Sequence, residues 1–165
     1  MRKTTAALIT AATTALATGA GLATASASPA AAASSGTEHF YLMTTSGTSN
    51  RSSVIAAGVF TAAGVDISGS STDTVQMPGG TFKIHHSGGP SGAPKVNPAT
   101  CFTTLTATDP FSVNGGAGKY KGLTGSGTAV ISIIAILARS HGACSENANP
   151  VAWHQTITGT AHVHL

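Results

Sequence analysis

The strongest constraint on the fold is the alternation of side chains over the last thirteen residues, 153–165. Apolar residues recur at odd positions, whereas threonines and histidines fill the even positions. A period of two places successive side chains on opposite faces of an extended strand. We therefore expect a long strand with one face in the core and the other facing water or a polar lumen. The two faces carry Trp153, Ile157, Ala161, Val163 and Leu165, and His154, Thr156, Thr158, Thr160, His162 and His164.

The remaining folded part of the chain also has an extended character. Short runs of β-branched and aromatic residues are separated by Gly, Ser, Pro, Asn and Asp, and no segment keeps a 3.6-residue apolar period. Turn-type sequences cover 68–72 and 87–97. The fold is therefore expected to be all-β. The expected strands are 38–45, 53–62, 73–77, 80–86, 101–108, 127–139 and 151–165.

The segment 129–137 is apolar at consecutive positions, which predicts a strand covered on both faces. The cover is either another layer of the fold or another subunit. Seven or eight strands within residues 38–165 fit a small antiparallel β-barrel or a sandwich. We favour the barrel, because closure removes exposed strand edges.

The first residues are typical of an export signal. Arg2 and Lys3 precede an uncharged apolar stretch, and small residues at 25–27 predict cleavage after Ala27, with cleavage after Ala30 as the alternative. We expect a signal peptide at 1–27, a disordered spacer at 28–37 and a single domain at 38–165. The apolar stretch is too short and too diluted for a membrane anchor. The protein is therefore expected to be secreted and extracellular.

Loss of the leader leaves six basic and five acidic residues, so the net charge falls from +3 to +1. The basic residues form no block or stripe that would follow a phosphate backbone. Nucleic acid is therefore excluded as a partner, as is a membrane after cleavage. No cofactor is expected.

The chain has two cysteines, Cys101 and Cys144. Exported proteins meet an oxidising environment in which paired thiols stay joined. A thiol nucleophile would need a neighbouring base, and a metal pair would favour closer spacing. We therefore predict a Cys101–Cys144 disulfide.

A glycine-rich segment, 111–128, reads as a strand end, a tight turn around Tyr120 and re-entry into the next strand. A Walker-type phosphate loop is excluded, because Tyr120 follows Lys119 where that loop needs Ser or Thr. The glycines of this turn are Gly115, Gly116, Gly118, Gly122, Gly125 and Gly127.

This glycine turn resembles the turn of allene oxide cyclase and dirigent-like β-barrels, and of small secreted actinobacterial proteins of unknown function that share it. The secreted proteins are also similar at 77–86, 97–101 and 138–145, so that resemblance covers roughly 74–165. It implies the barrel fold and no particular reaction. The active-site residues of the cyclase and dirigent enzymes find no counterparts, and none is carried over.

Histidine is unusually frequent, with seven in the chain. Alternating histidines on a strand chelate zinc or copper when a third ligand lies nearby. A metal site is one hypothesis, and a solvated polar strand face is the alternative. The candidate ligands are His85, His86, His154, His162 and His164.

The acidic residues are expected to have local roles, because most lie beside turn residues. The aromatic residues either fill the core or line a lumen for an apolar ligand. No catalytic elbow or metalloprotease motif occurs. The acidic residues are Glu38, Asp66, Asp73, Asp109 and Glu146, and the aromatic ones considered are Tyr41, Phe60, Phe82, Phe102, Phe111, Tyr120 and Trp153.

Three functional hypotheses follow. The first is a non-catalytic secreted barrel that binds a small apolar ligand in an apolar lumen, or that self-associates through the strand near 131–137. The second is an enzyme of isomerase or cyclase type, which requires at least one buried carboxylate or tyrosine near an open cavity. The third is a histidine-rich metal-binding protein, which requires converging imidazoles.

Overall fold

A computed structural model of the chain describes residues 34–86 and 91–165, so the expected signal peptide and most of the spacer lie outside the described residues. The described part contains strands and no helix, which agrees with the expected all-β class. The strands are β1 (Ser35–Thr44), β2 (Arg51–Ala57), β3 (Thr61–Ile67), β4 (Thr72–Met77), β5 (Gly80–His86), β6 (Lys95–Val96), β7 (Phe102–Gly118), β8 (Thr124–Ile136), β9 (Arg139–Ser140), β10 (Ala143–Cys144) and β11 (Ala152–His164).

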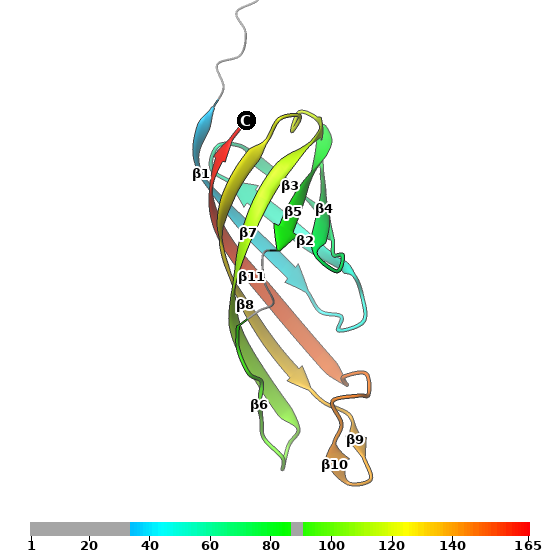
Figure 1. The fold of residues 1–165 in the computed structure, drawn as a ribbon. Coiled ribbons are helices and arrows are strands. Elements are labelled where there is room, and N and C mark those ends of the chain that lie inside the picture. The colour runs from blue at the N-terminus through cyan, green and yellow to red at the C-terminus, as the bar shows by residue number, and fades with distance from the viewer. Residues whose placement is uncertain (1–33, 87–90) are drawn as a thin grey trace, which may run out of the picture. The chain divides into compact units, whose positions relative to one another are not determined.

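Eight of these strands close into an antiparallel barrel, as expected (Figure 1). Each of β1 to β4 pairs with the strand that follows it, and β7, β8 and β11 continue the same meander. Pairing of β5 with β7 and of β11 with β1 closes the ring. Every long strand therefore has two hydrogen-bonded neighbours, which removes the exposed edges that invite aggregation.

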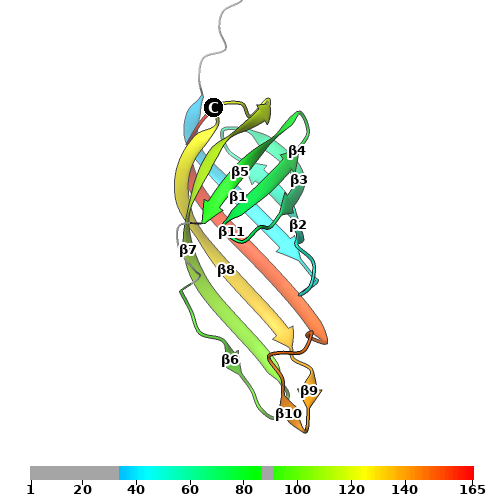
Figure 2. The same cartoon turned by 45° about the vertical axis from the view of Figure 1, so that its right-hand side comes forward.

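Three strands continue past the closed part of the barrel (Figure 2). β5 pairs only with the second half of β7, residues 111–118, so the first half of β7 extends beyond the end of β5. β8 pairs with β7 along this extension, and β11 pairs with β8. The short strand β6 pairs with this extension. The predicted disulfide is present, with 5.4 Å between the Cα atoms of Cys101 and Cys144. It fastens the start of β7 to the β9–β10 hairpin.

Some strand boundaries differ from those expected. The expected strand 53–62 is two strands, because the chain turns at Gly58, which has φ of 154°. β3 was not predicted, since Gly64 and Asp66 interrupt its apolar residues, of which only Val65 and Ile67 are large. β7 runs past its expected end at residue 108 to Gly118, because its second half pairs with β5. β1 begins at Ser35, inside the expected spacer, where it pairs with the end of β11.

The chain turns between β7 and β8 within the glycine-rich segment, and of the six glycines named for this turn only Gly122 lies between the two strands. β7 ends at Gly118, whose φ is +66°, and β8 begins at Thr124 after a turn that contains the buried Tyr120. A Cβ atom at Gly118 would collide with the carbonyl oxygen of Gly79. Only glycine fits this close approach, which joins the β7–β8 turn to the β4–β5 turn.

The barrel is filled by side chains at alternate strand positions. Phe40, Phe82 and Phe111 lie at its centre, and Phe60 and Tyr120 pack against Phe82 with ring centroids 6.1 and 5.5 Å apart. These rings belong to the core, which is one of the two roles expected for the aromatic residues. Tyr41 and Phe102 differ, because they point outward and are 49% and 43% exposed.

The apolar segment 129–137 is covered on one face only by the part of the chain that the structure describes. Ala129 and Ala135 are buried on the inner face of β8. Val130, Ile134 and Ile136 lie on the opposite face and are exposed. One of the two expected covers was a second layer of the fold. Within the described residues, no such layer lies over this face.

Candidate functional site

Several polar side chains share the inward-facing phase of their strands. Asp73 alternates with Val75 and Met77 on β4, and Asp109 alternates with Phe111 and Val113 on β7. His86 follows Phe82 and Ile84 at the same spacing on β5. Because side chains two residues apart face the same way, these groups point into the barrel.

An imidazole between two carboxylates forms the centre of the candidate site. The Nε2 atom of His86 lies 2.8 Å from Oδ2 of Asp73, and its Nδ1 atom lies 2.7 Å from Oδ2 of Asp109. The backbone N–H of Gly69 donates to Oδ1 of Asp73 over 2.9 Å. Two carboxylate acceptors take one hydrogen bond from each ring nitrogen, and the doubly protonated imidazolium is the form of the ring that satisfies both.

The surroundings act on His86 in opposite directions. Burial disfavours the charged ring, but the hydrogen bonds and negative charges of Asp73 and Asp109 outweigh this effect. They raise the pKa of His86 above its ordinary value of 6.5. His86 therefore keeps its second ring proton to a higher pH than an imidazole without neighbouring carboxylates does.

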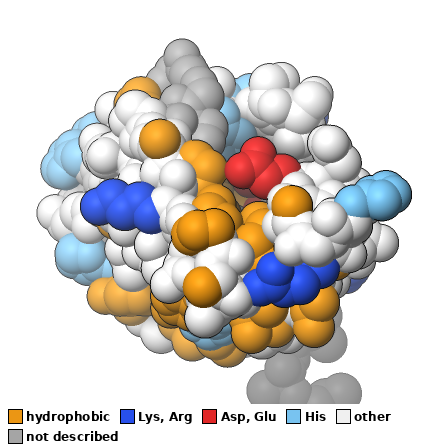
Figure 3. Space-filling model, turned by 90° about the horizontal axis from the view of Figure 1, so that it is seen from below, with side chains coloured by type: hydrophobic (Ala, Val, Ile, Leu, Met, Phe, Trp, Pro, Cys, Tyr) orange, Lys and Arg blue, Asp and Glu red, His pale blue; other side chains and the backbone are white. Residues whose placement is uncertain are grey.

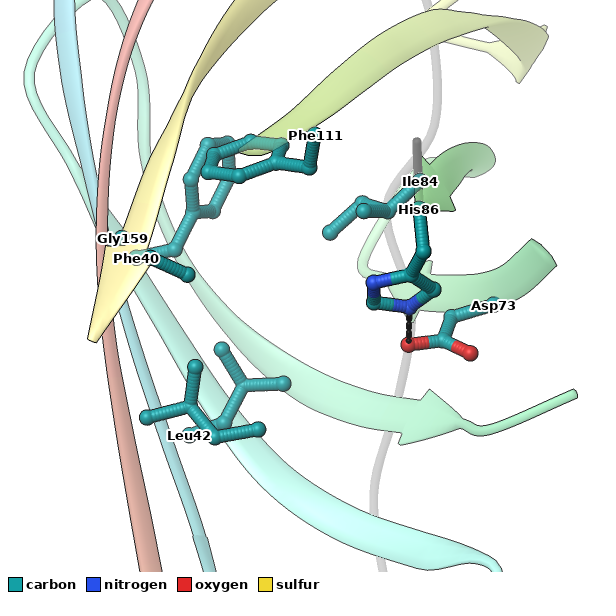
Figure 4. A pocket seen from close by; sticks show the side chains of 9 residues that line it. Phe40, Leu42, Asp73, Ile84, His86, Phe111 and Gly159 are labelled. Carbon is teal, nitrogen blue, oxygen red and sulfur yellow. Dashed lines mark hydrogen bonds and ion pairs between the residues drawn. The ribbon is translucent and has the colours of Figure 1, made fainter. Parts of the chain in front are cut away.

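An apolar pocket lies beside this ion cluster (Figure 4). Its volume is about 30 Å³, which is enough for a water-sized group. The His86 side chain is 30% exposed, so the polar end of the pocket is reached from solvent. The lining residues are Phe40, Leu42, Asp73, Ile84, His86, Phe111, Ala129, Ile157 and Gly159.

A third carboxyl group, that of Asp66, adds to the cluster. It is 1% exposed, and Ser68 donates a hydrogen bond to its Oδ2 atom over 3.2 Å. Burial and the charge of Asp73 raise the pKa of Asp66 to about 7. Within the described residues, Oδ1 of Asp66 and Oδ1 of Asp109 have no hydrogen-bond partner.

Glu38 is a separate buried carboxyl group. It is fully buried and accepts a hydrogen bond from the backbone N–H of Phe60 over 3.0 Å. Burial raises its pKa, and burial together with the charge of Glu38 raises the pKa of Tyr120. Neither residue lines the pocket beside His86.

The structure thus corrects the expectation that the acidic residues have purely local roles. Asp66 and Asp73 do bond to nearby Ser68 and Gly69, as turn residues commonly do. They are also buried inside the barrel, with Asp109 and Glu38. A polar residue in phase with the apolar side of a strand is the sequence signal that could have identified this placement.

The five predicted metal ligands are divided between the two sides of the barrel wall. His86 points inward, whereas its neighbour His85 bonds to the hydroxyl of Thr72 over 2.8 Å. His162 and His164 lie together on the outer face, with ring centroids 5.2 Å apart, and His154 lies in the same phase of β11. In the part of the chain that the structure describes, no group of three or more His, Cys, Asp or Glu is arranged to hold a metal.

Comparison with protein-family models, curated proteins and solved structures finds no match. Among residues 34–86 and 91–165, no helix is long and apolar enough to cross a membrane.

Proposed function

We propose that the protein is an enzyme of isomerase or cyclase type that acts on a small apolar substrate by acid–base chemistry. The observation that carries the proposal is an imidazole held between two carboxylates at the polar end of an apolar pocket. Perturbed, buried ionisable groups at a pocket are the usual signature of a catalytic site.

The burial of these groups supports a functional role. Asp66, Asp73 and Asp109 are each at most 6% exposed, in a barrel whose interior is otherwise mainly apolar. Taking carboxylates out of water costs stability unless they are fully paired. Apolar residues of similar size would fill the same positions at lower cost.

The chemistry requires no group beyond the chain and the substrate. Both N–H groups of the His86 imidazolium are held by carboxylates, so the ring exchanges its hydrogen bond to Asp73 for one to a polar atom of the substrate and donates its proton there. The carboxylate of Asp73 that this frees removes a proton from another atom of the substrate and returns it to His86 when the product leaves. One proton enters and one leaves, so an isomerisation or ring closure balances without a co-reactant. Since the pocket is small, only the reacting end of the substrate enters it.

A purely apolar binding barrel has less support. That hypothesis calls for a lumen without converging polar groups, and the pocket beside His86 does not have this character. A second hollow, of about 190 Å³, lies on the extension beside Leu105, Ile133 and Trp153. It contains one carboxylate, Glu146, and no imidazole, so it favours binding rather than catalysis.

We also propose that the protein acts outside the cytoplasm and is related to the allene oxide cyclase and dirigent-like barrels. The disulfide supports export, because such bonds persist in oxidising compartments. The eight-stranded meander and the glycine turn support the relationship.

The test is proton exchange with a panel of medium-chain enones, cyclic ketones and unsaturated epoxides in D₂O. We expect the protein to accelerate deuterium incorporation or rearrangement of at least one compound, as measured by mass spectrometry and chiral chromatography. His86→Gln should lose this activity, and His85→Gln, which changes the adjacent outward-facing histidine, should keep it. Equal activity of both variants, or binding without any reaction, would contradict the proposal.

A further inference from the structure

The outer faces of four neighbouring strands carry no charged side chain. β1, β7, β8 and β11 contain only two charged residues, Glu38 and Asp109, and both point into the barrel. We call the outward-facing side chains of these four strands the charge-free wall. Its polar positions are mainly threonine, serine and histidine.

Most of the exposed large hydrophobic side chains lie on this wall. Eight such side chains are exposed among the described residues, and six of them belong to the wall. A seventh, Ile55 on β2, is the cross-strand neighbour of Tyr41. Exposed apolar groups concentrated on one face mark an interaction surface. The six are Tyr41, Met43, Phe102, Val130, Ile134 and Ile136.

These side chains are connected through the register of the sheet. Tyr41 pairs with Thr158, and Thr158 pairs with Val130. Further along β8, Ile136 pairs with Phe102. The apolar groups therefore form one surface across adjoining strands, interrupted by small hydroxyl side chains and by His154, which pairs with Ile134.

The rest of the exterior is positively charged. Four of the five acidic residues are buried in the barrel, which leaves Glu146 as the exposed acid among the described residues. Six basic residues lie off the wall, so the exterior carries an excess of five basic groups. The basic residues are Arg51, Lys83, Lys95, Lys119, Lys121 and Arg139.

We infer that the charge-free wall is the contact surface for a second copy of this chain. Two copies repel each other through their basic exteriors, and the wall is the face on which this repulsion is weakest. Depletion of charge together with Tyr, Met and Phe is typical of the centre of an interface. On the face seen in Figure 3, basic side chains lie in separate groups with hydrophobic ones between them, which disfavours a polyanion as the partner.

The area available is sufficient for such a contact. Six large side chains about half exposed contribute roughly 500 Å² per copy, and stable interfaces bury about 800 Å² per partner. The surrounding threonines and serines supply the remainder. Their hydroxyl groups both donate and accept hydrogen bonds, so the surface is complementary to itself.

Sedimentation velocity of the purified, disulfide-bonded protein tests the inference, over concentrations from about 1 to 300 μM. We expect a concentration-dependent shift from one copy to two. Thr158→Glu places a charge at the centre of the wall and should weaken the association at least about tenfold. Gln76→Glu adds the same charge to the outer face of β4 and should leave the association unchanged.

A second variant, Ile134→Thr, removes apolar area without adding charge and should weaken the association severalfold. It serves as the test if Thr158→Glu fails to fold, as judged by circular dichroism. A single copy at every concentration would overturn the inference. So would equal effects of Thr158→Glu and Gln76→Glu, or binding of neutral lipid vesicles in place of a second copy.

Discussion

His86 and Asp109 are joined across the seam that closes the barrel, with 2.7 Å between Nδ1 and Oδ2. His86 and Asp109 are 23 residues apart in the sequence, and the pairing of β5 with β7 that brings them together is one of the two pairings that close the ring. The bond therefore couples the candidate site to the closure of the fold.

Removal of the imidazole should destabilise the barrel. His86→Ala leaves the carboxylates of Asp73 and Asp109 buried without their shared partner, which should cost about 2 to 3 kcal/mol. The free energy of unfolding in urea at pH 7 measures this loss. His85→Ala is the control, because that imidazole bonds to the hydroxyl of Thr72 and touches neither carboxylate. A similar loss in both variants would show that the ion cluster contributes little.

The stability of the protein should fall as the pH rises. The pKa of Asp66 is raised from 3.8 to about 7, so the folded state holds this proton more tightly than the unfolded chain does. The raised pKa of His86 acts in the same direction, because its stabilising charge is lost as the pH rises. We expect the free energy of unfolding to be about 2 to 4 kcal/mol lower at pH 8 than at pH 4.

Asp66→Asn should remove much of this pH dependence and raise the stability at pH 8. The amide keeps the size of the side chain and a hydrogen bond with Ser68, and it does not ionise between pH 4 and pH 8. Urea unfolding between pH 4 and pH 8 gives the slope, and Glu146→Gln, which changes an exposed acid, is the control. An unchanged slope in Asp66→Asn would assign the pH dependence to other groups.

Two glycines of the turn should respond differently to alanine. Gly118 has φ of +66°, and an added Cβ would collide with the carbonyl oxygen of Gly79. Gly122 has φ of +91°, but an added Cβ meets nothing within 4 Å. We expect Gly122→Ala to cost about 1 to 2 kcal/mol and Gly118→Ala at least twice as much. Urea unfolding of both variants tests this order.

Opening the disulfide should destabilise the protein by about 4 kcal/mol on the chain-entropy model. The bridge spans 43 residues and holds the β9–β10 hairpin against the start of β7. Unfolding of the Cys101→Ser/Cys144→Ser variant measures the loss. A change below about 1 kcal/mol would show that the extension holds its structure without the bridge.

Local patterns predicted much of the fold. Alternation identified the strand at 152–164, and the glycines identified the turn between β7 and β8. β3 was missed because Gly64 and Asp66 interrupt its apolar residues, and hydrogen bonding to β2 and β4 places it in the sheet.

The candidate site depends on one hairpin, β4–β5, and on the pairing of β5 with β7, which no tight turn joins. The sequence by itself determined the all-β class, the cysteine pair and the glycine turn, because each is encoded in residue types and short spacings. Only the tertiary structure decided that Asp73, His86 and Asp109 meet. Their contact requires the register of β4 with β5, which the two-residue turn at 78–79 sets locally, and the register of β5 with β7, which no tight turn sets and no local pattern contains.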